Sequence, residues 1–323
     1  MHLPVARKNN SGGAIAMWRV AAALRDRGVD VRVSAEKASA SKAFGFRLGS
    51  FASEIRHADV MLTAAGDATK TARVKARMCG VPVVTFVHSA ATPAWFPSAS
   101  AAPGLVVWGS ASLRARVTAR DGGWRGASMV MWPLIDADAV RVPAPGDRVT
   151  LVNLIPNKGV GLFWQIVEKM PHVKFLGVRG GWHAKKQVVP SVIPPNAEVA
   201  PFSPDPRRFY ERTRVLLYMR GENSGPDWLN GVGMAAMEAA VSGIPTIAHP
   251  GPGLMESMGD AGTWCDSDDP ADWCHAIDRM LQADVYAERS DTAAAHMAAL
   301  DQGASVDDLL GRMHQLAGRK VAA

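Results

Sequence analysis

A glycine turn followed by a short predicted helix holds the residues of this chain best suited to bind a nucleotide. Gly231 and Gly233 lack side chains, so the backbone can approach a ligand closely. The helix begins near Met234, and its unpaired N–H groups and positive dipole end favour an anion. Glu238 falls one turn into the helix, where a carboxylate can accept hydrogen bonds from sugar hydroxyls. The segment therefore predicts a site for a phosphate next to a sugar.

Lys158 lies in a second turn that could carry chemistry, between a predicted strand at 149–154 and a predicted helix at 160–170. A diphosphate that leaves a sugar gains negative charge as its bond breaks, and a fixed lysine stabilises that charge. The alternative is an exposed lysine at the start of a helix. A resemblance in the surrounding residues favours the first interpretation.

Residues 230–248 resemble the donor-site signature of GT-B glycosyltransferases of the large retaining family, the family 4-like or group 1 enzymes. In that signature two Glu flank seven residues, and an Ala-rich helix leads to Ser-Gly-Ile-Pro. Glu238 matches the second Glu, while Asn230 stands at the position of the first. The resemblance implies that Glu238 holds the ribose of the donor and that Asn230 orients its sugar. Whether an amide at Asn230 retunes this site or removes it stays open.

The turn at Lys158 resembles the Gly-Arg…Lys-Gly element of the same family, whose Arg and Lys bind the donor diphosphate. Lys158 matches the Lys, and Asn153 stands where Arg is usual. The missing cation could come from Arg179 or Arg220, which both follow predicted strands.

The N-terminal half offers two more candidates by the same resemblance. Gly12 and Gly13 match a glycine-rich loop near the start of these enzymes, and the alternative is an ordinary turn. His88 follows the predicted strand 81–87, where the family has a His that reaches the donor sugar. The alternative for His88 is a loop histidine with satisfied hydrogen bonds.

The segment 250–256 resembles the glycine loop and Glu that follow the donor strand in the family. Gly251 and Gly253 are expected to shape the sugar pocket with their backbone. Glu256 either binds the donor or caps the next turn.

The elements that must position these residues form two alternating series of strands and helices, which implies parallel sheets covered by helices. The expected fold is α/β, with two Rossmann-like domains facing each other across a cleft, the GT-B architecture. A Pro-rich joint at 132–146 separates an acceptor domain at 1–145 from a donor domain at 146–300, and 301–323 forms a helical tail. The predicted strands are 29–33, 59–62, 81–87, 105–108, 149–154, 173–178, 214–219 and 245–248, and the predicted helices are 11–28, 50–57, 69–78, 160–170 and 269–281 with a helical region from 283.

The composition is that of a globular protein, with 323 residues, 48% hydrophobic and 20% charged. The uncharged run 78–113 contains several prolines, so we expect no transmembrane span. The N-terminus lacks a signal-peptide pattern, which predicts a cytoplasmic protein, with peripheral contact to a membrane as an open alternative. The 3 cysteines have no Cys-x-x-Cys spacing, so neither a disulfide framework nor a zinc site is indicated.

Positive charge is concentrated in the first half. Residues 1–146 hold 19 Lys and Arg against 9 Asp and Glu, a net charge of +10, and the remainder carries −4. This charge either attracts an anionic acceptor or only solubilises the surface.

Two patterns could add to such a surface. Phe44, Leu48, Phe51 and Ile55 have helical spacing and belong to the core or to a membrane interface, of which we favour the core. The basic residues of the helix 69–78 could bind phosphates, but we favour a solvated face; they are Lys70, Arg73 and Arg77.

Together these features predict a retaining glycosyltransferase that moves a hexose or pentose from a nucleoside diphosphate sugar, with no metal or other cofactor. The acceptor would be a glycan, a lipid or a modified DNA base. No hydrolase elbow, P-loop, metalloprotease helix or zinc-finger spacing points elsewhere. A sugar-nucleotide epimerase or hydrolase of the same fold, or an impaired nucleotide-sugar binding protein, are the alternatives.

Overall fold

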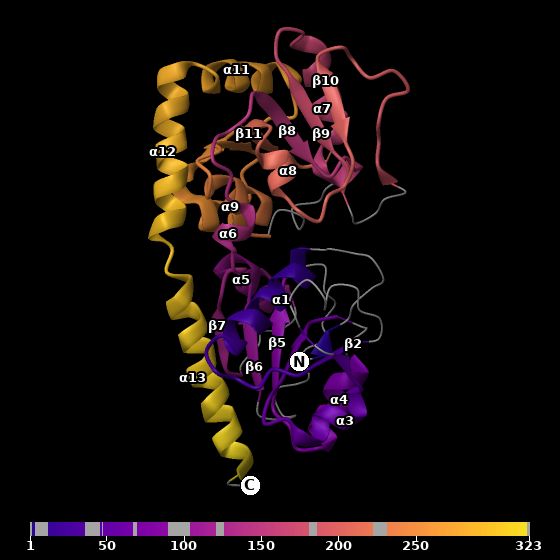
Figure 1. The fold of residues 1–323 in the computed structure, drawn as a ribbon, viewed down its shortest axis with the longest axis vertical. Coiled ribbons are helices and arrows are strands. Elements are labelled where there is room, and N and C mark those ends of the chain that lie inside the picture. The colour runs from indigo at the N-terminus through magenta and orange to yellow at the C-terminus, as the bar shows by residue number, and fades with distance from the viewer. Residues whose placement is uncertain are drawn as a thin grey trace. The chain divides into compact units, whose positions relative to one another are not determined.

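The computed structural model describes residues 2–3, 12–35, 46, 48–66, 70–89, 104–120, 126–180, 186–221 and 231–321. The chain divides into unit 1, made of 1–134 and 301–323, and unit 2, made of 135–300 (Figure 1). The first boundary lies inside the predicted Pro-rich joint, earlier than residue 145. The predicted C-terminal tail belongs to unit 1.

The described strands of unit 1 form two parallel sheets. One has the order β1-β2-β3 and the other β4-β5-β6-β7, and β1 lies close to β4. The sequence of strands is therefore that of a doubly wound fold, with its switch point between β1 and β4. The strands are β1 (His2–Leu3), β2 (Val33–Ala35), β3 (Leu48–Gly49), β4 (Met61–Ala64), β5 (Val83–Val87), β6 (Gly104–Trp108) and β7 (Ser128–Val130).

Helices cover both faces of the sheet β4-β5-β6-β7, because successive strand residues point to opposite sides. Leu62 and Phe86 join the core that α1 (Gly12–Arg25) and α13 (Gln302–Val321) cover. The neighbouring residues Met61 and Val87 join clusters under α4 (Lys70–Met78) and α5 (Ala111–Arg120). The short helices α3 (Phe51–Glu54) and η1 (Ile55–His57) complete the described helices of unit 1.

Unit 2 holds a parallel sheet of order β10-β9-β8-β11-β12-β13, whose switch point lies between β8 and β11. The strands are β8 (Arg148–Val152), β9 (Phe175–Val178), β10 (Ala197–Ala200), β11 (Thr213–Tyr218), β12 (Thr246–Ala248) and β13 (Gly262–Trp264). The helices are α6 (Ala137–Val140), η3 (Pro156–Lys158), α7 (Val160–Lys169), α8 (Arg207–Tyr210), α9 (Met234–Ala240), α10 (Pro252–Met258), η6 (Gly259–Ala261), α11 (Pro270–Met280) and α12 (Ala283–Ala299).

The largest core of unit 2 lies where α7 and α11 pack on the sheet. Phe163 and Trp273 are fully buried there with Phe175 of β9. The start of α11 follows the sequence signal: the Asp269 carboxylate accepts a hydrogen bond from the Ala271 N–H at 2.8 Å, and proline occupies the first helical position. On another part of the sheet α9 packs against β11 and β12.

Several predicted elements are confirmed with shifted ends, and some predictions are wrong. The strand expected at 29–33 begins only at Val33, since the turn after α1 runs through Gly28 at φ +82°. The helix expected at 50–57 is confirmed as α3 followed by η1. Leu48 belongs to β3, so no continuous helix joins Leu48 to Ile55. Ile55 is buried in a core cluster with Phe51 against it, as the core interpretation requires. Phe44 lies outside the described residues.

Arg73 does not lie on a solvated helix face. Its exposed fraction is only 8%, whereas Arg77 is half-buried, and the side chain of Lys70 is outside the described part. The prediction of a solvated basic face on α4 is therefore wrong at Arg73, the central residue of that face. No helix in the described part of the chain is both long and apolar enough to cross a membrane.

Candidate functional site

The predicted donor residues of unit 2 follow its strands at one edge of the sheet. Asn153 and Lys158 follow β8, and Arg220 follows β11, the two strands on either side of the switch point. The glycine turn before α9 is part of the connection from β11 to β12. Because open parallel sheets bind ligands beyond the carboxyl ends of their strands, this edge is the candidate site.

The glycine turn has the geometry that its sequence predicted. Gly233 has φ +67°, a left-handed conformation that favours glycine, and it is the N-cap of α9, which begins at Met234. A Cβ on Gly233 would also collide with the side chain of Leu254 on α10. Among the described residues, no atom lies within 4 Å of the place where a Cβ on Gly231 would stand. Asn230 lies outside the described residues.

Glu238 is half-buried one turn into α9 and has a phenol beside it. The Tyr210 hydroxyl donates to Glu238 Oε2 at 3.1 Å and shares its proton with the Ala235 carbonyl at 3.0 Å. Tyr210 itself is fully buried at the end of α8. A buried phenol therefore fixes one oxygen of the candidate ribose-binding carboxylate. Sequence reasoning missed this pair, since 28 residues separate its members.

The loop at 250–256 packs directly on the glycine turn. Ser257 on α10 donates to the Val232 carbonyl at 2.6 Å, and both residues are buried. Gly251 is the N-cap of α10, and Gly253 is buried within its first turn. Glu256 lies half-buried further along α10, so it does not cap the start of this helix.

Lys158 ends a 3-10 turn, and its position depends on close backbone packing. Gly159 follows it at φ +71°, where a Cβ would lie 2.5 Å from Met219 Cβ and 2.7 Å from the Arg220 carbonyl. The Lys158 ammonium lies over the ring of Tyr218, 4.8 Å from its centroid. The turn that carries Lys158 therefore rests on the end of β11.

Asn153 takes part in the local structure at the position where the family has Arg. Its φ of +73° is in the left-handed region that Asn tolerates. Asn153 Oδ1 accepts from Gln187 Nε2 at 2.9 Å, and Gln187 Oε1 accepts from the Gly180 N–H at 3.1 Å. The Asn153 side chain thus supports the loop after β9, where Arg179 stands exposed at the strand end.

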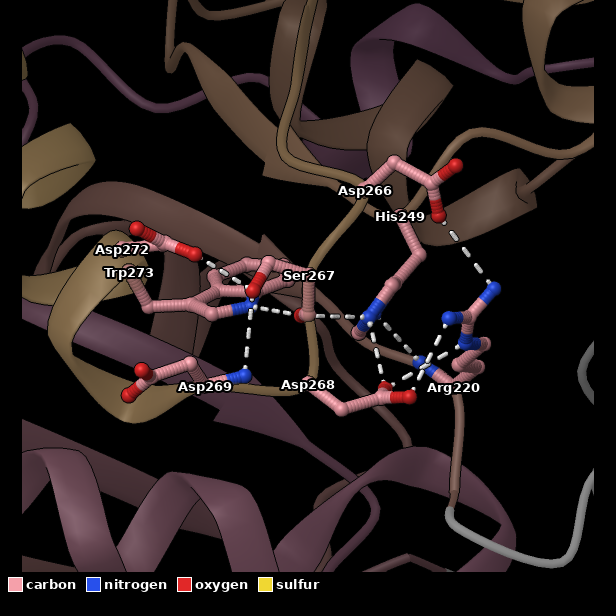
Figure 2. Close-up of polar contacts among 8 residues, drawn as sticks. All are labelled: Arg220, His249, Asp266, Ser267, Asp268, Asp269, Asp272 and Trp273. Carbon is pink, nitrogen blue, oxygen red and sulfur yellow. Dashed lines mark hydrogen bonds and ion pairs between the residues drawn. The ribbon is translucent and has the colours of Figure 1, made fainter.

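Arg220, the other candidate for the second cation, already has carboxylate partners. Its guanidinium contacts both oxygens of Asp268 at 3.3 and 3.2 Å and Asp266 at 3.3 Å (Figure 2). The Arg220 side chain is 30% exposed, and its guanidinium holds the pKa of the Asp268 carboxyl below its usual range. The charge of Arg220 is therefore balanced within unit 2.

His249 is the centre of this polar cluster, and sequence reasoning missed it. The ring is fully buried after β12; Nδ1 accepts from the Arg220 N–H at 3.1 Å and Nε2 faces the Ser267 carbonyl at 3.0 Å (Figure 2). This pattern requires the neutral ring with its proton on Nε2. Burial lowers the pKa of His249, and the nearby Arg220 charge lowers it further.

In unit 1 the structure brings Gly13 and His88 together. A Cβ on Gly13 would lie 3.3 Å from His88 Cδ2, so the first turn of α1 packs against the imidazole. Gly12 begins the helix at an exposed position. His88 Nε2 is buried and has no hydrogen-bond partner among the described residues. Burial lowers the pKa of His88 to about 4, so the ring is neutral at pH 7.

A family model and solved structures match this arrangement. Residues 148–283 match the family model described as Glycosyl transferases group 1, which spans the sheet, the Lys158 turn and the glycine turn of unit 2. No match to the sequence was found among curated proteins.

The fold is shared with solved glycosyltransferase structures over nearly the whole chain. A glycosyltransferase from Rickettsia africae is 12% identical, with 98% of each chain covered and a TM-score of 0.73. Sucrose-phosphate synthase from Thermosynechococcus elongatus is 13% identical, with 97% of this chain and 98% of that chain covered and a TM-score of 0.70. Anabaena HepE, solved with UDP-glucose, is 15% identical, with 100% and 99% covered and a TM-score of 0.67. The parallel sheets of the two units with their flanking helices are thus the GT-B fold.

Proposed function

We propose that this glycosyltransferase, with its Glycosyl transferases group 1 domain in unit 2, transfers a hexose or pentose from a nucleoside diphosphate sugar. The transfer retains the anomeric configuration of the sugar and needs no metal. The observation that carries the proposal is that Lys158 and the Gly233 turn both follow strands that end at the switch-point edge of the sheet. UDP-glucose in the complex of Anabaena HepE indicates the class of donor that we expect here.

Each proposed contact has a chemical reason. The Lys158 ammonium stabilises the diphosphate as it leaves, because it is held in place before the reaction. Glu238, fixed by Tyr210, accepts hydrogen bonds from ribose hydroxyls. Gly231, Gly233 and the amide of Met234 bring the backbone close to the diphosphate.

The remaining predicted residues would orient the sugar. We assign this role to Asn230, to the loop of Gly251 and Gly253, and to His88, whose buried Nε2 has no partner among the described residues and could bond one hydroxyl. Glu256, Asn153, Arg179 and Gly12–Gly13 shape the surroundings of the donor in this proposal. The basic half of the chain would attract an anionic acceptor.

Donor binding can be tested by thermal unfolding with UDP-, GDP-, ADP- and dTDP-sugars. A ligand at 100 times its Kd adds about 2.7 kcal/mol to the free energy of unfolding, which gives a clear rise in Tm. Glu238→Ala should abolish this rise, whereas Glu168→Ala, the same change at an exposed position on α7, should keep it. A rise that persists undiminished in Glu238→Ala would contradict the assigned site.

Product analysis then separates transfer from its alternatives. NMR of the product should show a new glycosidic bond with the anomeric configuration of the donor. Turnover of the donor without any acceptor would indicate an epimerase or hydrolase instead. Tight donor binding without turnover would indicate an impaired binding protein, in which Asn153 and Asn230 have replaced the family's charged residues.

A further inference from the structure

The end of β11 is held from one side by the buried ring of His249. The ring accepts a hydrogen bond from the Arg220 N–H, and Nε2 lies 3.0 Å from the Ser267 carbonyl and 3.2 Å from Asp268 Oδ1. Trp273, also fully buried, lies 4.8 Å away between ring centroids and donates to the same Ser267 carbonyl at 2.7 Å (Figure 2). The imidazole thus ties β11 to the loop after β13.

The same stretch of backbone also touches the turn that carries Lys158. Gly159 has no room for a Cβ because Met219 and the Arg220 carbonyl occupy that space. Gly221 is similarly close to the Pro156 carbonyl. Residues 219–221 therefore lie between the His249 cluster and the turn 156–159, in contact with both.

The side chain of Arg220 fixes this backbone a second time. Its ion pairs with Asp266 and Asp268 lie on the same loop that His249 contacts. One hydrogen bond to the main chain and two ion pairs to the side chain leave residue 220 little freedom to move. Movement here would displace the surface on which Gly159 and Lys158 rest.

From this arrangement we infer that His249 is a positioning residue for the diphosphate of the donor, acting through the Arg220 main chain on Lys158. The inference rests on the proposed function, because Lys158 must contact the diphosphate. His249 itself is buried and touches no donor atom in this mechanism. Its contribution is a fixed location for the ammonium group, which strengthens diphosphate binding without adding charge.

The test compares a nucleoside diphosphate with its own nucleoside by calorimetry, using whichever of UDP, GDP, ADP and dTDP stabilises the protein most. Only the diphosphate can report on Lys158, so the ratio of the two affinities is the readout. Lys158→Ala should lower this ratio on the order of 10-fold, the loss of one charge-assisted contact. His249→Leu should lower it by a comparable factor.

A double-mutant cycle distinguishes positioning from general damage. In a protein that already carries Lys158→Ala, adding His249→Leu should leave the ratio unchanged, since the affected contact is gone. His249→Asn should restore most of the ratio, because an amide oxygen near the place of Nδ1 can accept from the Arg220 N–H. Thr150→Val, which removes the buried 2.9 Å bond between the hydroxyls of Thr150 and Thr213, should lower stability and keep the ratio.

Each outcome has one meaning. If Lys158→Ala lowers the ratio and His249→Leu does not, the positioning role is wrong and the proposed function stands. Equal losses from His249→Leu with and without Lys158 would also overturn the positioning role. If Lys158→Ala leaves the ratio unchanged, both the role of Lys158 in the proposed function and that of His249 fail. Should His249→Leu not fold, His249→Ala, which also removes the acceptor, takes its place: a lowered ratio would support the inference, and a ratio near that of the unmodified protein would overturn it.

Discussion

Protonation of His88 should make unit 1 less stable below neutral pH, and this can be measured. Burial lowers the pKa of the folded ring from 6.5 to about 4. At pH 7 the ring is mostly neutral in both the folded and the unfolded protein. Below 6.5 the unfolded chain binds a proton that the folded chain does not bind until about pH 4, so the free energy of unfolding falls with pH across this window.

The size of the effect follows from the two pKa values. A pKa that differs by one between the folded and unfolded ring corresponds to about 1.4 kcal/mol, so the whole window is worth roughly 3 kcal/mol. Between pH 7 and pH 5 the loss should be about 2 kcal/mol, because pH 5 lies more than halfway down the window. His88→Gln keeps a neutral polar side chain of similar length and does not titrate, so it should lack this loss.

The assay compares the two proteins at pH 7 and pH 5 by urea unfolding, with hydrogen exchange of the β5 amides to report on unit 1 alone. Carboxylates that titrate in both proteins cancel in the difference. Histidine NMR of the unmodified protein gives the folded pKa directly, with the His88 signal identified by its absence in His88→Gln. A folded-state pKa equal to that of a free histidine, or a stability difference that stays constant between the two pH values, would refute the burial argument.

Two further changes test the packing of unit 2. Tyr210→Phe removes only the hydroxyl that fixes Glu238 and should leave the fold intact. The affinity for the donor, measured by calorimetry, should fall roughly 5-fold, which is about 1 kcal/mol of binding free energy. An unchanged affinity would mean that Glu238 needs no support from Tyr210. Gly159→Ala combines a left-handed φ with a collision against Met219 and should lower the free energy of unfolding in urea by about 2 kcal/mol or more. Gly28→Ala, also at positive φ but with no described atom within 4 Å of the new Cβ, should lower it by about 1 kcal/mol. Equal losses of unfolding free energy at the two glycines would show that the end of β11 moves to make room for the new Cβ on residue 159.

Local chemistry made parts of the fold predictable from the sequence. Gly233 and Gly243 have the positive φ that punctuates a helix, and Asp269 caps α11 through its carboxylate. Longer strands such as β5 and β6 contain enough apolar residues to be recognised. The short strands β10 and β13 are less apolar and only partly buried, so their residues carry too little hydrophobic pattern to be recognised, unlike the buried short strand β12.

The contacts among the polar residues around His249 could not be predicted, because only the fold brings these residues together. Arg220, His249 and Asp268 come from the ends of separate strands, and 48 residues separate the arginine from its carboxylate. Each residue by itself is typical of a loop. The burial of Arg73 has the same origin: only the packing of α4 on the sheet decides which side of a basic helix meets water.

The membership of α13 in unit 1 determines when this unit can finish folding. Val306, Leu309, Met313 and Leu316 fill the core beside α1, and at about 2 kcal/mol each they contribute roughly 8 kcal/mol, as much as the net stability of many domains. During synthesis these side chains leave the ribosome after the whole of unit 2. Unit 1 therefore begins to be translated before unit 2 but is completed after it, and a nascent chain must keep the side of the unit 1 strands that α13 covers from aggregating until α13 is made.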